Sequence, residues 1–219
     1  MNHWTLLQLA DSALPYGGFA HSGGLEAAAQ LGRCNGSEGL ARFIEDALWT
    51  CGSGPLLFAV AACAEPAQAP ELDLRCDAAT PGQVANRASR LQGQAFLRAV
   101  AAAHPAEIGP MVNEVRAARL PSHLAPWFGA ALGRLGAAPE QAAQIFLFQS
   151  ARGVVSAGVR LGLVGPLEAQ ELLAGAGPVA EEVQRACAGR APSEAAASAP
   201  LLDLLQGHQE RLYSRLFQS

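Results

Sequence analysis

The 219-residue sequence contains no lysine, and its positive charge comes from 15 arginines. Only 16 % of the residues are charged, and the formal net charge is −4. Without lysine the chain cannot carry the G-x-x-x-x-G-K-[ST] phosphate loop of nucleotide hydrolases, and G-x-G-x-x-G is absent too. The acidic balance argues against nucleic acid as a partner, because such binding needs a basic stripe. The low fraction of charged residues and the 50 % of hydrophobic residues favour a protein that buries part of its surface against a partner.

Closely spaced metal ligands are also missing. The five cysteines, at positions 34, 51, 63, 76 and 187, form no C-x-x-C pair, and their odd number fits poorly with a disulfide framework. H-x-x-x-H does not occur either. His3, His21 and His208 could share a nickel ion only if both chain ends or two subunits converge. Cys51 and Cys63 lie in apolar segments, and we expect them to be inert core residues.

No apolar run is long enough to span a bilayer. The charge-free apolar run 51–64 is short and contains Pro55. Residues 1–4 lack the basic start of a signal peptide. We therefore expect a cytoplasmic protein with no membrane partner.

Alternating strand patterns are absent, whereas alanine and leucine are abundant, which favours helices. We expect an all-α fold: a single compact bundle of about eight to ten helices around a central apolar helix, with a C-terminal tail. The expected division is a helical domain over 1–198 and a C-terminal helix with its tail over 199–219. Apolar spacing and proline or glycine breaks predict helices over 37–48, 56–64, 82–104, 105–120, 124–135, 139–163, 167–173, 179–187 and in 199–217.

Within this plan, 65–81 is expected to be a loop or a short helical piece, and 189–198 a linker. The segment 139–163 is apolar on nearly all sides, which predicts the central buried helix. Gly153 and Gly158 within it are expected to let neighbouring elements approach closely.

A glycine-rich stretch from Leu14 to Glu26 is the most distinctive local feature, with four glycines and one proline in 13 residues. Pro15 restricts the backbone and predicts an ordered turn, after which a helix should begin with Ser22 as a candidate N-cap. Two interpretations remain open. The stretch is either a tight connection between packed helices or a shaped surface loop.

The C-terminal segment carries large apolar residues at helical spacings, namely Leu205, Leu212, Tyr213, Leu216 and Phe217. A chain end of this composition would expose apolar groups to water if it were left free. It therefore either docks on its own domain or folds into a groove of another protein. Arginine, tyrosine and phenylalanine together are typical of interface hot spots.

The amino-acid sequences of both terminal segments closely resemble those of the UreF family of urease accessory proteins. Residues 6–26 read LLQLADSALPYGGFAHSGGLE, and residues 208–219 read HQERLYSRLFQS, like the family ending H-E-x-Q-Y-S-R-L-F-R-S. The middle agrees as well, since 156–161 read SAGVRL and 88–97 resemble a glycine-containing family helix. The resemblance implies an all-helical homodimer that is not an enzyme. It implies a UreD(UreH)-type scaffold, a UreG-type GTPase and apo-urease as partners in nickel delivery, with no stably bound cofactor and at most transient nickel.

By position, the resemblance implies a partner-binding surface and neither catalytic nor metal-binding residues. Arg160 is implied to be a structural or interface residue. Two rivals remain open, a small hydrolase or transferase that uses the glycine-rich stretch with His21 and Ser22, and a nickel carrier. The implied partner-binding residues are Gly17, Gly18, Phe19, His21, Ser22, Tyr213, Ser214, Arg215, Leu216 and Phe217.

Overall fold

The protein is built from helices alone in the part of the chain that its computed structural model describes, residues 1–196 and 198–218. Ala197, in the expected linker, and Ser219, the last residue of the tail motif, lie outside the described residues. The all-α prediction is confirmed. The α-helices are α1 His3–Ala10, α2 Leu25–Gln30, α3 Gly36–Ser53, α4 Pro55–Ala64, α5 Ala69–Ala79, α6 Gln83–Ala103, α7 Pro105–Ala118, α8 Leu124–Arg134, α9 Pro139–Arg160, α10 Pro166–Cys187 and α11 Pro200–His208.

The number of helices and one helix boundary need correction. Of the two alternatives for 65–81, the helical one is observed, as the eleven-residue helix α5, and the described residues form eleven α-helices, one more than the expected upper number. The two helices expected over 167–173 and 179–187 are one continuous helix, α10, with Pro178 inside it. Proline removes one backbone hydrogen bond. Because Ala174 and Pro178 are exposed, water can satisfy the freed carbonyl group and the helix continues.

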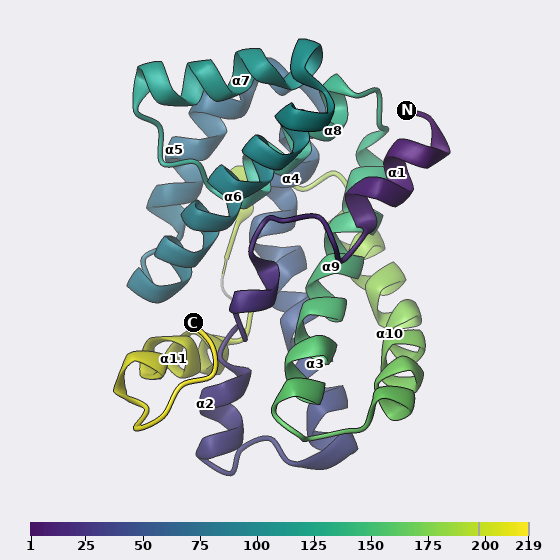
Figure 1. Ribbon diagram of the computed structural model, residues 1–219, viewed down its shortest axis with the longest axis vertical. Coiled ribbons are helices and arrows are strands. Elements are labelled where there is room, and N and C mark those ends of the chain that lie inside the picture. Colours follow the sequence, from purple (N-terminus) through teal and green to yellow (C-terminus); the bar gives the residue numbers. More distant parts are fainter. Residues whose placement is uncertain (197, 219) are drawn as a thin grey trace.

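The helices are arranged around α4 and α9 (Figure 1). α5, α6, α7 and α8 form the upper part of the view, and α2, α3, α10 and α11 surround the lower part. α9 packs against α3, α4, α8 and α10, as expected for the central helix. α4 shares this central position, since Leu56 through Ala59, Ala62 and Cys63 are all buried. The core is therefore organised by two apolar helices.

Glycines set the closest helix contacts. A Cβ atom added at Gly129 of α8 would lie 1.9 Å from the Ala59 carbonyl oxygen of α4, so only glycine permits this approach. At Gly158 of α9, an added Cβ would lie 2.4 Å from Leu40 of α3, which confirms the expectation for this residue. The expectation for Gly153 is wrong, because an added Cβ there would meet no atom within 4 Å.

Within the described residues, no single helix has the length and apolar character needed to cross a membrane. The pair α3 and α4 passes such a test together by length and composition only, and it is bent by 46°.

Candidate functional site

The two terminal motifs of the chain lie against each other. The glycine-rich stretch runs into α2, and α11 with the C-terminal segment packs beside α2, at the lower left of Figure 1. The backbone N–H of Gln218 donates to the Ala20 carbonyl oxygen at 2.8 Å, and the Gln30 side chain donates to the Ser214 carbonyl oxygen at 3.0 Å. Of the two possibilities for the tail, docking on its own domain is the one observed. We call residues 14–24 the glycine loop and residues 209–218 the tail.

The glycine loop is fixed at both of its ends. At its start, Tyr16 is buried and its ring makes an edge contact with Phe96, with centroids 6.4 Å apart. Phe96 in turn stacks at a tilt on Phe128 of α8, so the loop is anchored in the aromatic core. At its end, Gly24 has φ +92° and precedes the first residue of α2. An added Cβ at Gly24 would lie 3.0 Å from the Gln206 backbone nitrogen of α11. Both the positive φ and this close approach therefore favour glycine at position 24.

The carboxylate of Glu26 holds the tail. Glu26 is only 2 % exposed, and it accepts hydrogen bonds from the backbone N–H groups of Leu216 at 2.6 Å and Phe217 at 3.2 Å. The buried side chain of Gln209 donates to the same carboxylate at 2.6 Å. A buried carboxylate needs such donors, because leaving water without them is costly. Glu26 therefore fixes the path of the tail across the start of α2.

Arg160, at the end of α9, joins the loop to the tail. Its guanidinium carbon lies 3.8 Å from the centre of the Phe19 ring and 4.2 Å from the centre of the Phe217 ring. The guanidinium also donates to the Phe19 carbonyl oxygen at 2.5 Å. Cation–π contacts on two rings place Arg160 between one residue of each terminal motif. At the outer edge, Arg87 of α6 forms an ion pair with Glu210 at 2.8 Å.

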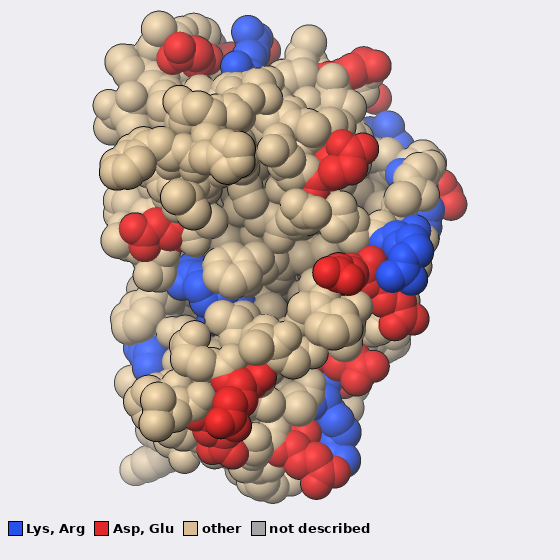
Figure 2. All heavy atoms as spheres, turned by 90° about the vertical axis from the view of Figure 1, so that its right-hand side faces the viewer, with Lys and Arg blue, Asp and Glu red and all other residues tan. Residues whose placement is uncertain are grey.

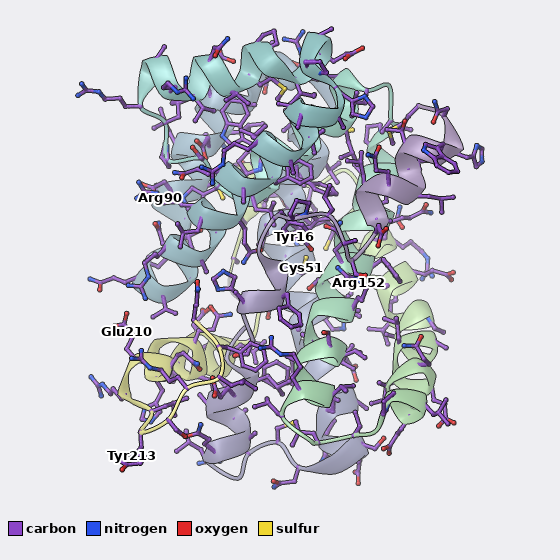
Figure 3. All side chains as sticks on the ribbon, viewed as in Figure 1. Tyr16, Cys51, Arg90, Arg152, Glu210 and Tyr213 are labelled. Carbon is purple, nitrogen blue, oxygen red and sulfur yellow. The ribbon has the colours of Figure 1, made fainter. Side chains whose placement is uncertain are left out.

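The implied partner-binding residues are divided between surface and interior. Phe19 is 69 % exposed, Leu216 is 53 % exposed, and Tyr213 is fully exposed and points away from the molecule (Figure 3). Phe217 and Ser22 are buried, at 4 % and 2 % exposed. Gly17, Ser214 and Arg215 are also exposed, whereas Gly18 and His21 are half-buried. We call the exposed members Gly17, Phe19, Tyr213, Ser214, Arg215 and Leu216 the loop–tail surface.

His21 and Ser22 lie where the glycine loop enters α2. The Ser22 hydroxyl accepts the backbone N–H of Glu26 at 3.4 Å, so it supports the start of α2 even though Gly24 is the N-cap residue. Burial, followed by the positive charge of Arg87, lowers the pKa of His21. The imidazole is therefore predominantly neutral at pH 7.

Sequence reasoning missed the two side chains that hold the tail, Glu26 and Gln209. Both stand inside the quoted motifs, yet neither was singled out. The available signal was Glu26 itself, a charged residue within the apolar run Leu25 to Ala28 that proves to be buried throughout.

A second buried polar network, also missed, positions α8. Both carboxylate oxygens of Asp73 accept backbone N–H groups, those of Ser122 and His123, each at 2.7 Å. The fully buried His123 ring contacts Asp77 at 2.9 Å through Nε2 and the Ser89 hydroxyl at 3.1 Å through Nδ1. The His123 hydrogen bond is the main cause that lowers the pKa of Asp77. The network satisfies the backbone at the start of α8.

The cysteines are buried throughout the described residues and form no disulfide. Burial raises the pKa of Cys51 to about 12 and that of Cys63 to about 11, so both thiols stay protonated at neutral pH. This agrees with the prediction that Cys51 and Cys63 are core residues. Among the residues described, no group of three or more His, Cys, Asp or Glu side chains has metal-binding geometry.

A cleft of about 690 Å³ lies behind the glycine loop. Its walls come from the loop and from α3, α6 and α9, and Tyr16, Cys51 and Arg152 all line it (Figure 3). We call it the loop cleft.

Comparison with known proteins decides the family. The sequence model of the UreF family matches residues 34–177. The chain is similar to urease accessory protein F of Arabidopsis thaliana, with 39 % identity over 223 residues that cover 99 % of this chain and 92 % of the relative. The chain belongs to the UreF family. Urease accessory protein F of rice is also 39 % identical, over 98 % of this chain and 84 % of the relative. Urease accessory protein UreF of Mycobacterium tuberculosis is 33 % identical, over 94 % of both.

The comparisons confirm the resemblance drawn from the two ends of the chain. The UreF match covers the middle, while the alignments with the relatives extend over nearly the whole chain. UreF relatives are named as accessory proteins of urease, and the chain is accordingly an accessory protein and not an enzyme.

Proposed function

We propose that this UreF-family chain is a urease maturation chaperone that acts in the cytoplasm as an adaptor. It binds a UreD(UreH)-type scaffold and recruits a UreG-type GTPase, so that nickel is delivered to apo-urease. Nickel is the cargo of this assembly and not a resident cofactor of the chain.

One observation carries the scaffold part of the proposal. Both terminal motifs, separated by most of the sequence, form one continuous surface around Glu26 and Arg160. This surface leaves Phe19, Tyr213 and Leu216 exposed to water. Exposed aromatic and aliphatic groups beside an arginine are typical of interface hot spots. The loop–tail surface is therefore the proposed docking site for the scaffold.

Co-purification with the UreD-type scaffold tests this proposal. Tyr213→Ala and Leu216→Ala should each weaken binding by about 1–3 kcal/mol, the usual range for hot-spot residues, without unfolding the chain. Leu74→Ala is the matched control, because Leu74 is 55 % exposed on α5 and is not part of the loop–tail surface. Wild-type affinity in both surface variants would overturn the assignment of the surface. Phe217→Ala is a poorer probe, because Phe217 is buried and its loss would release the tail.

Recruitment of the GTPase is tested with the purified scaffold present. We expect the UreG-type GTPase to co-purify with the pair of scaffold and adaptor, and the complete assembly to activate apo-urease with nickel and bicarbonate. Equal activation without this chain would reject the adaptor role. Equilibrium dialysis with Ni²⁺ separates an adaptor from a nickel carrier, since an adaptor should retain no stoichiometric nickel by itself.

The homodimer implied by the family is also part of the proposal. Trp4 and Leu7 of α1 are 80 % and 69 % exposed, and α1 packs on α9, where Phe148 is 42 % exposed. The side of the molecule that carries α1 has a broad uncharged area in its upper part (Figure 2). Exposed large apolar side chains on an uncharged area favour association. Phe148→Asp should shift the chain to a monomer in sedimentation analysis, and an unchanged mass would place the dimer contact elsewhere.

A further inference from the structure

The loop cleft contains one charged side chain. Of the described residues that line it, only Arg152 of α9 carries a full charge at neutral pH, and none is acidic. His21 also lines the cleft, but burial lowers its pKa, so it adds little positive charge at pH 7. The cleft is thus an uncharged hollow with a single guanidinium in its wall.

Arg152 has no acidic partner among residues 1–196 and 198–218. None of the ion pairs among the described residues includes it. Its Nε atom is buried and has no hydrogen-bond partner in this part of the chain. Burial is the larger cause and raises the pKa of the Tyr16 phenol, whereas the positive charge of Arg152 lowers it, so the phenol remains neutral. The described residues thus leave the positive charge of Arg152 without compensation.

A half-buried guanidinium without an anion is costly, because it has lost part of its hydration and gained no counter-charge. A planar guanidinium matches a carboxylate with two parallel hydrogen bonds. A single positive charge balances a monoanion, whereas a phosphate monoester brings about two negative charges. The chemistry of the wall therefore favours a carboxylate.

The residues that line the rest of the cleft indicate the chemistry of the rest of the ligand. Phe43 and Ala47 of α3, Phe146 and Val154 of α9, and Leu124 line the cleft with apolar groups. The volume of about 690 Å³ far exceeds that of a carboxylate group and falls in the range of small-molecule pockets. We propose that the loop cleft binds an amphipathic carboxylate, with its single negative charge on Arg152 and its apolar body between α3 and α9.

Gly153 keeps the cleft open beside Arg152. It lines the cleft, and an added Cβ at this position would contact no atom within 4 Å. A larger side chain at Gly153 can thus enter the cleft without displacing a helix. This provides a variant that fills the site while Arg152 and the fold are retained.

Calorimetric titration of the purified full chain tests the proposal with defined probes. Hexanoate represents a free small acid, and N-acetyl-leucine represents the carboxyl end of a peptide. Hexanamide and N-acetyl-leucinamide are the uncharged controls, and hexyl phosphate is the dianionic control. We expect a carboxylate to bind at least about tenfold more tightly than its amide and more tightly than the phosphate. The stronger of the two acids identifies the source of the carboxylate.

Three variants complete the test. Arg152→Gln should weaken carboxylate binding about tenfold or more, and Gly153→Leu should abolish it. Arg98→Gln removes an exposed arginine of α6 that does not line the cleft, and it should bind like the wild type. Circular dichroism verifies folding, and Gly153→Leu remains decisive if Arg152→Gln is unstable. Equal affinity for acids and amides, absence of binding by every acid, or wild-type binding by Gly153→Leu would each overturn the proposal. A negative result in these titrations would not affect the proposal of scaffold binding, because the titrations use the isolated chain without the scaffold.

Discussion

At the scale of single residues, a buried glutamate links two distant parts of the chain. Glu26 accepts three hydrogen bonds from the tail, two from backbone and one from the Gln209 side chain. Charge-assisted hydrogen bonds of this type are stronger than neutral ones. When one partner of a buried hydrogen bond is removed, the other partner stays desolvated without compensation, which costs free energy. The position of the tail therefore depends on one carboxylate.

Glu26→Gln tests that dependence with almost no change in size. We expect the free energy of unfolding to fall by about 1–3 kcal/mol, because the amide can accept only at one atom and loses the charge. Hydrogen exchange should accelerate at the amides of Leu216 and Phe217. Glu38→Gln, at an exposed glutamate paired with Arg42, is the control and should change stability by less than about 0.5 kcal/mol. Unchanged exchange in the tail would contradict this role of Glu26.

His21 predicts a dependence of stability on pH. Its pKa is lowered in the folded chain, by burial first and by Arg87 second, relative to about 6.5 when unfolded. The unfolded state therefore binds more protons, so stability is complete above about pH 6.5 and decreases as the pH falls towards the folded pKa. Urea unfolding between pH 7.5 and 5 should show a steeper loss for the wild type than for His21→Gln. Parallel curves for the two proteins would refute the assignment.

At the scale of helices, close contacts between α4 and α8 and between α3 and α9 build the core beneath the site. They depend on positions where any side chain would collide with a neighbour, such as Gly129 against the Ala59 carbonyl oxygen. A backbone oxygen cannot rotate away as a side chain can. The α4–α8 contact should therefore tolerate no added atom.

Gly129→Ala should destabilise the chain by about 1–3 kcal/mol, the usual cost of overpacking. Gly153→Ala is the matched control within another helix, because its Cβ meets nothing within 4 Å. The control should stabilise the chain by about 0.5–1 kcal/mol, since alanine favours helix more than glycine does. Thermal unfolding of both variants provides the measurement, and similar shifts would show that the close contact has little energetic weight.

At the scale of the whole molecule, the two ends of the chain form one unit. The tail covers Glu26 and Phe217 packs on Arg160, so removing the tail exposes the Glu26 carboxylate to water and takes away its three donors. The shortened chain loses these charge-assisted hydrogen bonds together with the burial of Phe217. The end of the chain is therefore part of the fold as well as part of the proposed docking surface.

A chain that stops after Gly207 should unfold at a lower temperature than the full chain. Adding Glu26→Gln to the truncated chain should cost little further stability, because the carboxylate has no tail donors left to lose. In the full chain the same substitution should be destabilising. The difference between the two effects in a double-mutant cycle measures the coupling between Glu26 and the tail. Additive effects would mean that the two do not interact.

Local patterns determined the secondary structure well. Apolar spacing with proline and glycine breaks located the helices α3, α4, α6, α7, α8 and α9, since a buried helical face repeats every three or four residues. Local signals left loop and short helix open for 65–81, and they wrongly predicted a helix break before Pro178, which lies inside α10. Helix α5 is held by its contacts with α4 and α8, and such contacts leave no trace in local composition.

The sequence by itself determined the helical class, the family resemblance and the two motifs, because these depend on residues that are neighbours along the chain. Only the tertiary structure decided that the motifs meet, that Glu26 holds the tail, that Phe217 is buried and that Arg152 has no acidic partner within the described part of the chain. Each of these depends on which residues pack together across the fold. Burial then sets the free-energy cost of every unpaired charge. Burial depends on how the chain packs and cannot be read from the order of its residues.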